Sequence, residues 1–272
     1  MDSKIAEALR LENHPVALTW ADAFPIGAAH FVPGRWACVM SMIAAVATDG
    51  RTAAFDRDTY GCWGGGVGLG FGNCYETFPG GVDGFCRFLS DGNEKSEAGR
   101  EMGLCVSSWG RRDFAADYKQ GERYLKDPAT AARFVDSMPM CDIPAKCVIF
   151  TPLEKIESAD DSLQSVTLFV TADQLSALIV LANYTDPDFE NVLVPWAAAC
   201  QVIGIFGYRE NGSAHPRGLV GLSDLSARLN ARGVLGANMM SFTMPWPLFV
   251  KMEENVAGSF LDRPTWKELQ KR

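Results

Sequence analysis

Eight cysteines are the residues of this sequence best suited to chemistry, and their spacing restricts what that chemistry can be. They are Cys38, Cys62, Cys74, Cys86, Cys105, Cys141, Cys147 and Cys200. No two form a C-x-x-C pair, which excludes zinc ribbons, thioredoxin-like redox pairs and the usual ferredoxin run. Thiolates are soft ligands that select iron–sulfur clusters or zinc. Any metal site must therefore be assembled by the fold from distant segments, and each cysteine alone is more commonly a small buried hydrophobe.

A glycine-rich stretch, YGCWGGGVGLGFG, surrounds Cys62. Glycine loses more backbone entropy on folding than any other residue, so we expect another group to approach this backbone closely. The stretch has neither the G-x-G-x-x-G spacing of a dinucleotide-binding turn nor the Lys-Ser/Thr end of a P-loop. Two interpretations remain. Either the small residues let a helix pack tightly against a sheet, or Gly64, Gly65, Gly66 and Gly68 form a loop around a cofactor.

Composition narrows the class of protein. The 272 residues suit one large domain or two small ones, and a hydrophobic fraction of 47% is ordinary for a globular core. The formal net charge is −8 and no basic cluster exceeds the pair Arg111-Arg112, which argues against a nucleic-acid partner. No apolar run is long enough for a membrane span, and residues 1–15 resemble an amphipathic helix rather than a signal peptide. We therefore expect a cytoplasmic protein without a membrane partner, in which disulfides are disfavoured.

Alternating short apolar runs and helical patterns predict an α/β or α+β fold, with helices packed on a mixed β-sheet. Strands are predicted over residues 15–20, 51–56, 146–156, 165–171, 190–196, 217–230 and 239–245. Helices are predicted over 1–15, 35–50, 82–93, 127–138, 172–184 and 246–256. Residues 93–120 are polar and are predicted to be an irregular surface excursion. The strands at 165–171 and 190–196, with the helix between them, are expected to form a βαβ unit.

The two halves of the sequence contain similar segments in the same order, which suggests a pseudo-repeat. In each half of the chain an apolar helix leads to a Thr-Asp pair, a predicted strand, a cysteine and a glycine-spaced apolar segment. Cys62 and Cys200 occupy equivalent places in the two copies. The halves would be residues 1–145 and 146–272, and both thiols are expected to converge on one site.

Five stretches spread along the chain are distinctive: GCWGGGVGLGF, DQLSALIVLANY, VPWAAACQVIGIFGYRE, GLVGLSDLSARLN and SFTMPWPLFVKMEENVAGSFL. In these stretches the sequence resembles a family known as domain of unknown function 169, common in anaerobic bacteria and archaea. The resemblance implies a single domain over residues 1–272. It also implies that Cys38, Cys62 and Cys200 are family positions, with Cys86 added in the closest branch. It supplies no reaction.

These positions favour an iron–sulfur protein with a redox or substrate-binding role, in which Cys38, Cys62 and Cys200, with Cys86 as fourth ligand, hold a [4Fe–4S] cluster. Glycine N–H groups beside Cys62 would donate hydrogen bonds to the cluster sulfides. Such a protein would meet a redox partner or a small-molecule ligand, and it could form a homo-oligomer. The alternatives are a module that binds a small apolar ligand without metal, a structural zinc protein, and thiol catalysis with His14, His30 or His215.

The segment SDLSARLN supplies charged candidates. On a helix, Asp224 and Arg228 would form an ordinary i,i+4 pair. Alternatively, Asp224, Ser226 and Arg228 point from a strand end into a ligand site, where the arginine binds a carboxylate. Substrate binding by these three residues therefore stays an open prediction.

Overall fold

The computed structural model describes residues 1–34, 37–109 and 112–271. The chain forms two compact units. The sheet unit comprises residues 1–71 and 141–272, and the helical unit comprises residues 72–140. The division therefore does not follow the expected halves 1–145 and 146–272, because the helical unit is inserted between two segments of the sheet unit.

The described residues of the sheet unit form a seven-stranded sheet in the order β2-β3-β1-β4-β7-β6-β5. The strands are β1 (Val16–Ala21), β2 (Ala53–Asp56), β3 (Cys147–Pro152), β4 (Leu163–Val170), β5 (Val192–Leu193), β6 (Gly218–Gly221) and β7 (Met240–Pro245). The edge strand β5 pairs parallel with β6, whereas the other described pairs are antiparallel. The mixed sheet with packed helices is thus confirmed.

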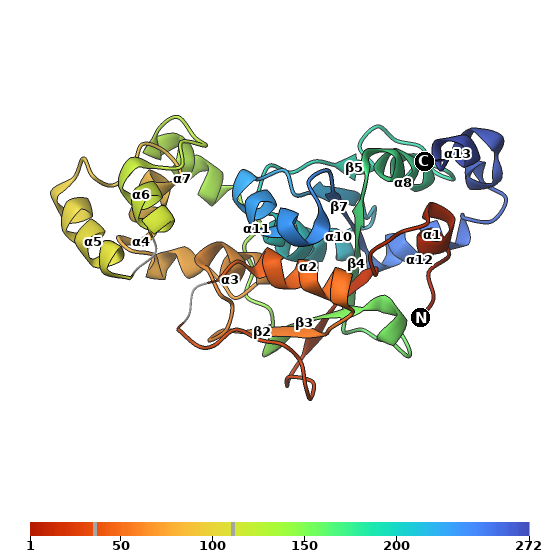
Figure 1. The fold of residues 1–272 in the computed structure, drawn as a ribbon, viewed down its shortest axis with the longest axis horizontal. Helices are drawn as coiled ribbons and strands as arrows, with labels where there is room; N and C mark the ends of the chain where they lie inside the picture. The colour runs from red at the N-terminus through yellow and green to blue at the C-terminus, as the bar shows by residue number, and fades with distance from the viewer. Residues whose placement is uncertain (35–36, 110–111, 272) are drawn as a thin grey trace. The chain divides into compact units, whose positions relative to one another are not determined.

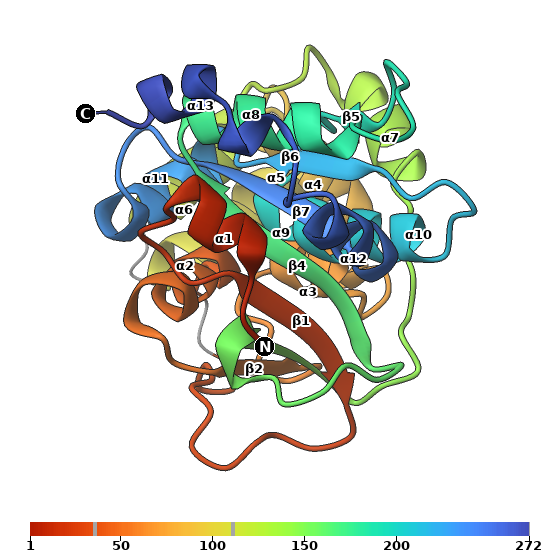
Figure 2. The same cartoon turned by 90° about the vertical axis from the view of Figure 1, so that its right-hand side faces the viewer.

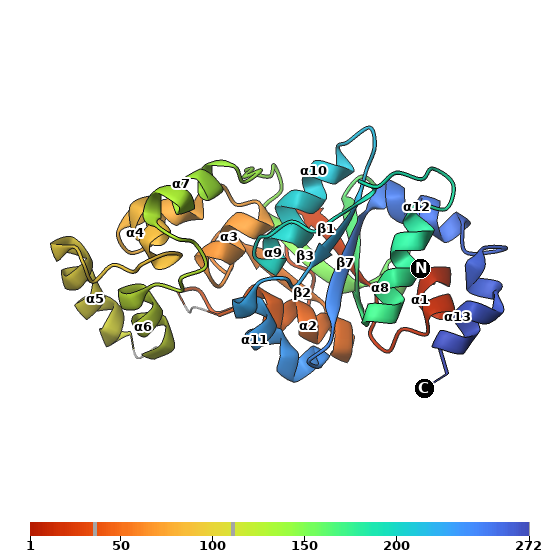
Figure 3. The ribbon, with the colours of Figure 1, turned by 90° about the horizontal axis from the view of Figure 1, so that it is seen from above.

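Helices cover both faces of this sheet (Figures 1 and 3). One face carries α1 (Lys4–Leu9), α8 (Ala172–Ala182), α12 (Trp246–Glu254) and α13 (Pro264–Leu269). The other carries α2 (Val39–Asp49), α9 (Ala199–Gln201), α10 (Gly207–Asn211) and α11 (Leu225–Leu235). Figure 2 shows α1, α8 and α12 in front of β4 and β7.

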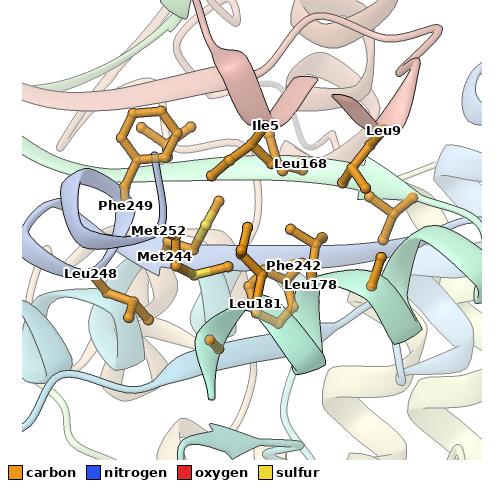
Figure 4. Packing of buried hydrophobic residues seen from close by; sticks show 14 of the residues in the cluster. Ile5, Leu9, Leu168, Leu178, Leu181, Phe242, Met244, Leu248, Phe249 and Met252 are labelled. Carbon is orange, nitrogen blue, oxygen red and sulfur yellow. The ribbon is translucent and has the colours of Figure 1, made fainter. Parts of the chain in front are cut away.

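The main hydrophobic core lies under α1, α8 and α12 (Figure 4). Alternation along the strands sends Leu168 of β4 and both Phe242 and Met244 of β7 to this face, and all three are fully buried. Leu178 of α8 and Met252 of α12 pack against them. Burying side chains of this size contributes about 1.5–3 kcal/mol each, so this layer anchors the sheet that positions the opposite face.

The helical unit contains α4 (Gly81–Phe88), α5 (Glu97–Ser108), α6 (Arg112–Gln120) and α7 (Pro128–Asp136). The prediction that residues 93–120 are irregular is therefore wrong, although residues 110–111 lie outside the described residues. The α5 helix packs through small residues: a Cβ at Gly99 would collide with the Asn93 carbonyl oxygen, and Gly103 lies against Lys119. A stripe of glycines carries no apolar periodicity, which is why the sequence pattern missed this helix.

Several local expectations also change. The predicted strand at 190–196 shrinks to the two residues of β5, and 217–230 contains β6 followed by the start of α11. β4 and β5 do run parallel, but β7 and β6 lie between them. The predicted helix at 35–50 is observed as α2, its residues 35–36 being outside the described part. The pseudo-repeat is not confirmed, since β2 pairs antiparallel with β3 while β5 pairs parallel with β6.

A candidate thiol site at converging helix starts

Two of the predicted cysteines stand side by side at the start of two helices. Cys38 is the N-cap of α2, and Cys62 is the N-cap of α3 (Trp63–Leu69). The residues just before them are hydrogen bonded, because the Ala37 amide donates to the Gly61 carbonyl oxygen at 3.3 Å. Gly61 has a φ of 78°, and a Cβ there would lie 2.6 Å from the Ala37 oxygen, so glycine is required for this approach.

The Cys62 side chain acts as a helix cap. Its Sγ accepts a hydrogen bond from the Gly65 amide at 3.3 Å. An N-cap side chain satisfies one of the backbone N–H groups that the first helical turn leaves unpaired. The same geometry suits a thiolate, since the N-terminus of a helix carries partial positive charge.

Cys200 joins this pair from the second half of the chain. It lies in the first turn of α9, is buried, and its Sγ donates to the Gly64 carbonyl oxygen of α3 at 3.4 Å. Burial raises the pKa of the Cys200 thiol well above its ordinary value, and the neighbouring Cys62, Cys38 and Asp224 raise it further. The contacts of Cys200 with Gly64 and of Ala37 with Gly61 therefore bring the segments of Cys38, Cys62 and Cys200 together, although they are far apart in sequence.

The glycine run forms the helix α3, so the expectation of a glycine-rich loop at Gly64, Gly65, Gly66 and Gly68 is wrong. The close approach is between two helices (Figure 3). A Cβ on Gly68 would lie 2.8 Å from the Gln201 amide nitrogen, so α3 and α9 touch backbone to backbone.

A second glycine, Gly204, completes this contact from the other side. A Cβ on Gly204 would collide with the Gly68 carbonyl oxygen. Gly65 is closed in by the Val39 side chain of α2, whereas a Cβ on Gly64 would meet nothing within 4 Å. The glycines therefore let three helix starts come close enough for their cysteines to meet.

The helix that carries Cys200 contains a π-helical segment, Val202–Phe206, between α9 and α10. π-helical turns are rare in proteins, and many of those that are found lie at functional sites. This segment includes Gly204, the residue that contacts α3, and it begins two residues after Cys200. The irregular turn thus links the thiol to the helix–helix contact.

Asp224 is a functional candidate whose placement the sequence did not reveal. It is the N-cap of α11: one carboxylate oxygen accepts from the Ala227 amide at 2.8 Å, and the other accepts from the Ala199 amide of α9 at 2.9 Å. Burial raises the pKa of Asp224, although these hydrogen bonds and Arg228 lower it in part. One carboxylate therefore holds the starts of both α11 and the Cys200 helix.

Arg228 and Ser226 are placed on α11 rather than at a strand end. The Arg228 guanidinium donates to the carbonyl oxygens of Leu222, Ala237 and Met239 at 3.1, 2.8 and 3.2 Å. Arg228 therefore fixes the segment after α11, and Ser226 lies in the first turn of the helix. The i,i+4 interpretation of Asp224 and Arg228 describes this geometry better than a strand end does.

Cys86 lies in the helical unit, on α4, and is 3% exposed. Burial raises the pKa of its thiol, and Asp83 and Asp136 raise it further. Among the other cysteines, Cys147 donates its Sγ hydrogen to the Ala21 carbonyl oxygen at 3.1 Å, and Cys105 is exposed on α5.

Two of the three histidines considered for thiol catalysis, His14 and His30, have other neighbours. His14 pairs with Glu154 at 2.6 Å, and Nδ1 of His30 lies 3.3 Å from the Ala28 carbonyl oxygen.

Within residues 1–34, 37–109 and 112–271, no three His, Cys, Asp or Glu side chains are grouped as ligands of a single metal ion. No helix in the same ranges is both long and apolar enough to cross a bilayer.

Comparison with known protein families identifies the family of this chain. The model of the family DUF169, described as uncharacterised ArCR, matches residues 4–255, and the chain belongs to this family. No curated protein and no solved structure matches the chain. The family description names no reaction, so the site itself must carry the functional argument.

Proposed function

We propose that this member of the DUF169 family is an iron–sulfur protein in which Cys38, Cys62 and Cys200 hold a [4Fe–4S] cluster. The observation that supports this function is the meeting of the three cysteine segments: the Cys200 Sγ donates to the Gly64 carbonyl oxygen in the helix that Cys62 caps, and Ala37, next to Cys38, is hydrogen bonded to Gly61, next to Cys62. Their segments are remote in sequence, and a protein that needed only small hydrophobes at these positions would have no reason to gather them. Soft thiolates in such a group select iron–sulfur clusters or zinc.

A cluster and a single zinc ion require different spacings of the sulfur atoms. Ligands of a tetrahedral zinc lie about 2.3 Å from the metal, so their sulfur atoms crowd together around it. A [4Fe–4S] cluster attaches each cysteine to a different iron and so requires more widely spaced sulfur atoms. Structural zinc is the second candidate.

The surroundings of Cys38 and Cys62 also favour an anionic group. α2 and α3 begin at Cys38 and Cys62, and the helix of Cys200 begins beside them. The partial positive charges of these helix starts stabilise thiolates, and the Gly65 amide already donates to a sulfur atom. Hydrogen bonds to sulfur and local charge are the features by which proteins tune a cluster's potential.

Three thiolates leave one iron for another ligand. That position would belong to Cys86, to a small molecule or to a redox partner, and we propose that the site serves redox or substrate-binding chemistry in the cytoplasm. When bound, the cluster would supply electron transfer or Lewis acidity. The chain's own residues would hold it, shield it behind α3 and α9, and donate hydrogen bonds to its sulfur atoms.

The test is anaerobic purification followed by iron, sulfide and zinc analysis. We expect about four iron and four sulfide per chain and a brown protein. Cys200→Ser should lose most of the iron, whereas Cys105→Ser, at an exposed position outside the thiol group, should retain it. Stoichiometric zinc without sulfide, or full iron in Cys200→Ser, would overturn the proposal.

A further inference from the structure

A pocket of about 490 Å³ lies along α11 and the segment that follows it. This volume falls within the range of small-molecule binding sites. Its walls are largely apolar and include Leu222, Leu225, Leu229, Leu235 and Met239. All of these residues belong to the sheet unit, and none takes part in the thiol group.

Two of the leucines are unusually exposed for their size. Leu225 and Leu229 lie four residues apart on one side of α11, and they are 64% and 73% exposed. Single exposed leucines are common on protein surfaces, but here the two border one concave site. A ligand with a hydrocarbon body would remove this apolar surface from water, which is favourable by about 25 cal/mol per Å².

The charge of the pocket is positive. Arg228 and Arg232 line it, and none of the described lining residues is acidic. Arg228 donates hydrogen bonds to neutral carbonyl groups, and its charge also acts on the Asp224 carboxylate, so Arg232 is the cation left for a ligand. Arg232 is exposed in the last turn of α11 and forms no ion pair with any residue that the structure describes.

We propose that this pocket binds a small organic acid with an apolar body, its hydrocarbon against Leu225 and Leu229 and its carboxylate toward Arg232. Charge complementarity selects this ligand, because the Arg232 guanidinium, which has no ion-pair partner among the described residues, disfavours a cation and gains little from a neutral molecule. The site needs no metal. It shares α11 with the thiol group only through Asp224, the N-cap of that helix.

The experiment titrates the full-length protein with octanoate, octanol and octylamine by calorimetry and by chemical-shift changes. Octanoate is expected to bind saturably and more tightly than the other two. Arg232→Gln should weaken octanoate about two- to fivefold, the range for a partly exposed ion pair, and should leave octanol unchanged. Leu229→Ser should weaken both about five- to tenfold through lost apolar burial.

Lys267→Gln is the matched control, because it also removes one positive charge from the last turn of an exposed helix, α13. It should bind octanoate like the wild type. The proposal is overturned by an absence of saturable octanoate binding, by equal or tighter binding of octanol or octylamine, or by octanoate binding that neither Arg232→Gln nor Leu229→Ser affects. Because iron and sulfide are measured separately, binding of octanoate to a cluster-free protein would leave this inference intact while the iron–sulfur proposal fails.

Discussion

Replacing Gly204 by alanine tests whether the glycine contact between α3 and the Cys200 helix holds the thiol site together. A Cβ at this position would collide with the Gly68 carbonyl oxygen, which is backbone and cannot rotate away. Overpacking of this kind costs about 1–3 kcal/mol. The glycine-to-alanine change itself gains about 0.4–1 kcal/mol by restricting the unfolded chain. We therefore expect Gly204→Ala to lower the free energy of unfolding by about 1–2 kcal/mol.

Gly233→Ala is the matched control. Gly233 also lies within a helix, α11, but a Cβ there would meet nothing within 4 Å. This variant should be more stable than the wild type by the 0.4–1 kcal/mol of the backbone effect alone. Urea unfolding monitored by circular dichroism measures both changes.

The same two variants report on the site. Because Gly204 lies four residues after Cys200, separating the helices should also reduce iron binding in Gly204→Ala and not in Gly233→Ala. A Gly204→Ala protein that is as stable as Gly233→Ala and binds as much iron would refute the reasoning, since it would mean that the two helices do not touch at these glycines.

Further predictions concern one buried and one half-buried carboxylate. Glu210 is 1% exposed and accepts from the Arg217 guanidinium at 2.9 and 2.8 Å, so Glu210→Gln should cost about 2–3 kcal/mol in urea unfolding, less than for a fully buried pair because Arg217 is partly exposed. Burial raises the pKa of Glu210, but Arg217 and Arg209 outweigh this effect and the net pKa is lowered. The stability that this group contributes is therefore present at neutral pH and is lost as the pH falls through the lowered pKa. The decrease of wild-type stability at acid pH should be smaller in Glu210→Gln, and an unchanged decrease would contradict this. Asp224→Ala should cost about 1–2 kcal/mol and reduce iron content, because two helix starts lose a cap, whereas Asp127→Ala, which uncaps α7 in the helical unit, should lose stability only.

Elements whose signals are local in sequence could be predicted. The start of α7 follows from Asp127 as N-cap and Pro128 in the first turn, and the structure has both. The short apolar runs at 165–171 and 239–245 likewise predicted β4 and β7, the strands that bury Leu168 and Phe242. In these segments propensity, capping and periodicity all agree with the tertiary structure.

Elements that depend on tertiary contact could not be predicted in this way. Glycines are poor helix formers, so the sequence did not predict α3 and α5. Glycine is needed at Gly68 of α3 and Gly99 of α5 because a neighbouring backbone occupies the space that a Cβ would fill. The convergence of Cys38 and Cys62 rests on the hydrogen bond between Ala37 and Gly61, which leaves no trace in sequence spacing. The family positions identified the cysteines that meet, but only the fold reveals that each one stands at a helix start.

The fourth ligand of the proposed cluster decides whether one iron is open to a substrate, and Cys86→Ser addresses it. Cys86 is 3% exposed on α4, between Phe85 and Phe88 of the helical unit's aromatic core. Cys86 belongs to the helical unit, whereas Cys38, Cys62 and Cys200 all belong to the sheet unit. We therefore expect Cys86→Ser to keep its full iron and sulfide while losing about 1 kcal/mol of stability. Anaerobic iron analysis and the electron paramagnetic resonance spectrum of the reduced protein measure this, with Cys105→Ser as the control in the same unit. A folded Cys86→Ser protein with three iron atoms, or with an altered spectrum, would instead make Cys86 the fourth ligand and close the site to substrate.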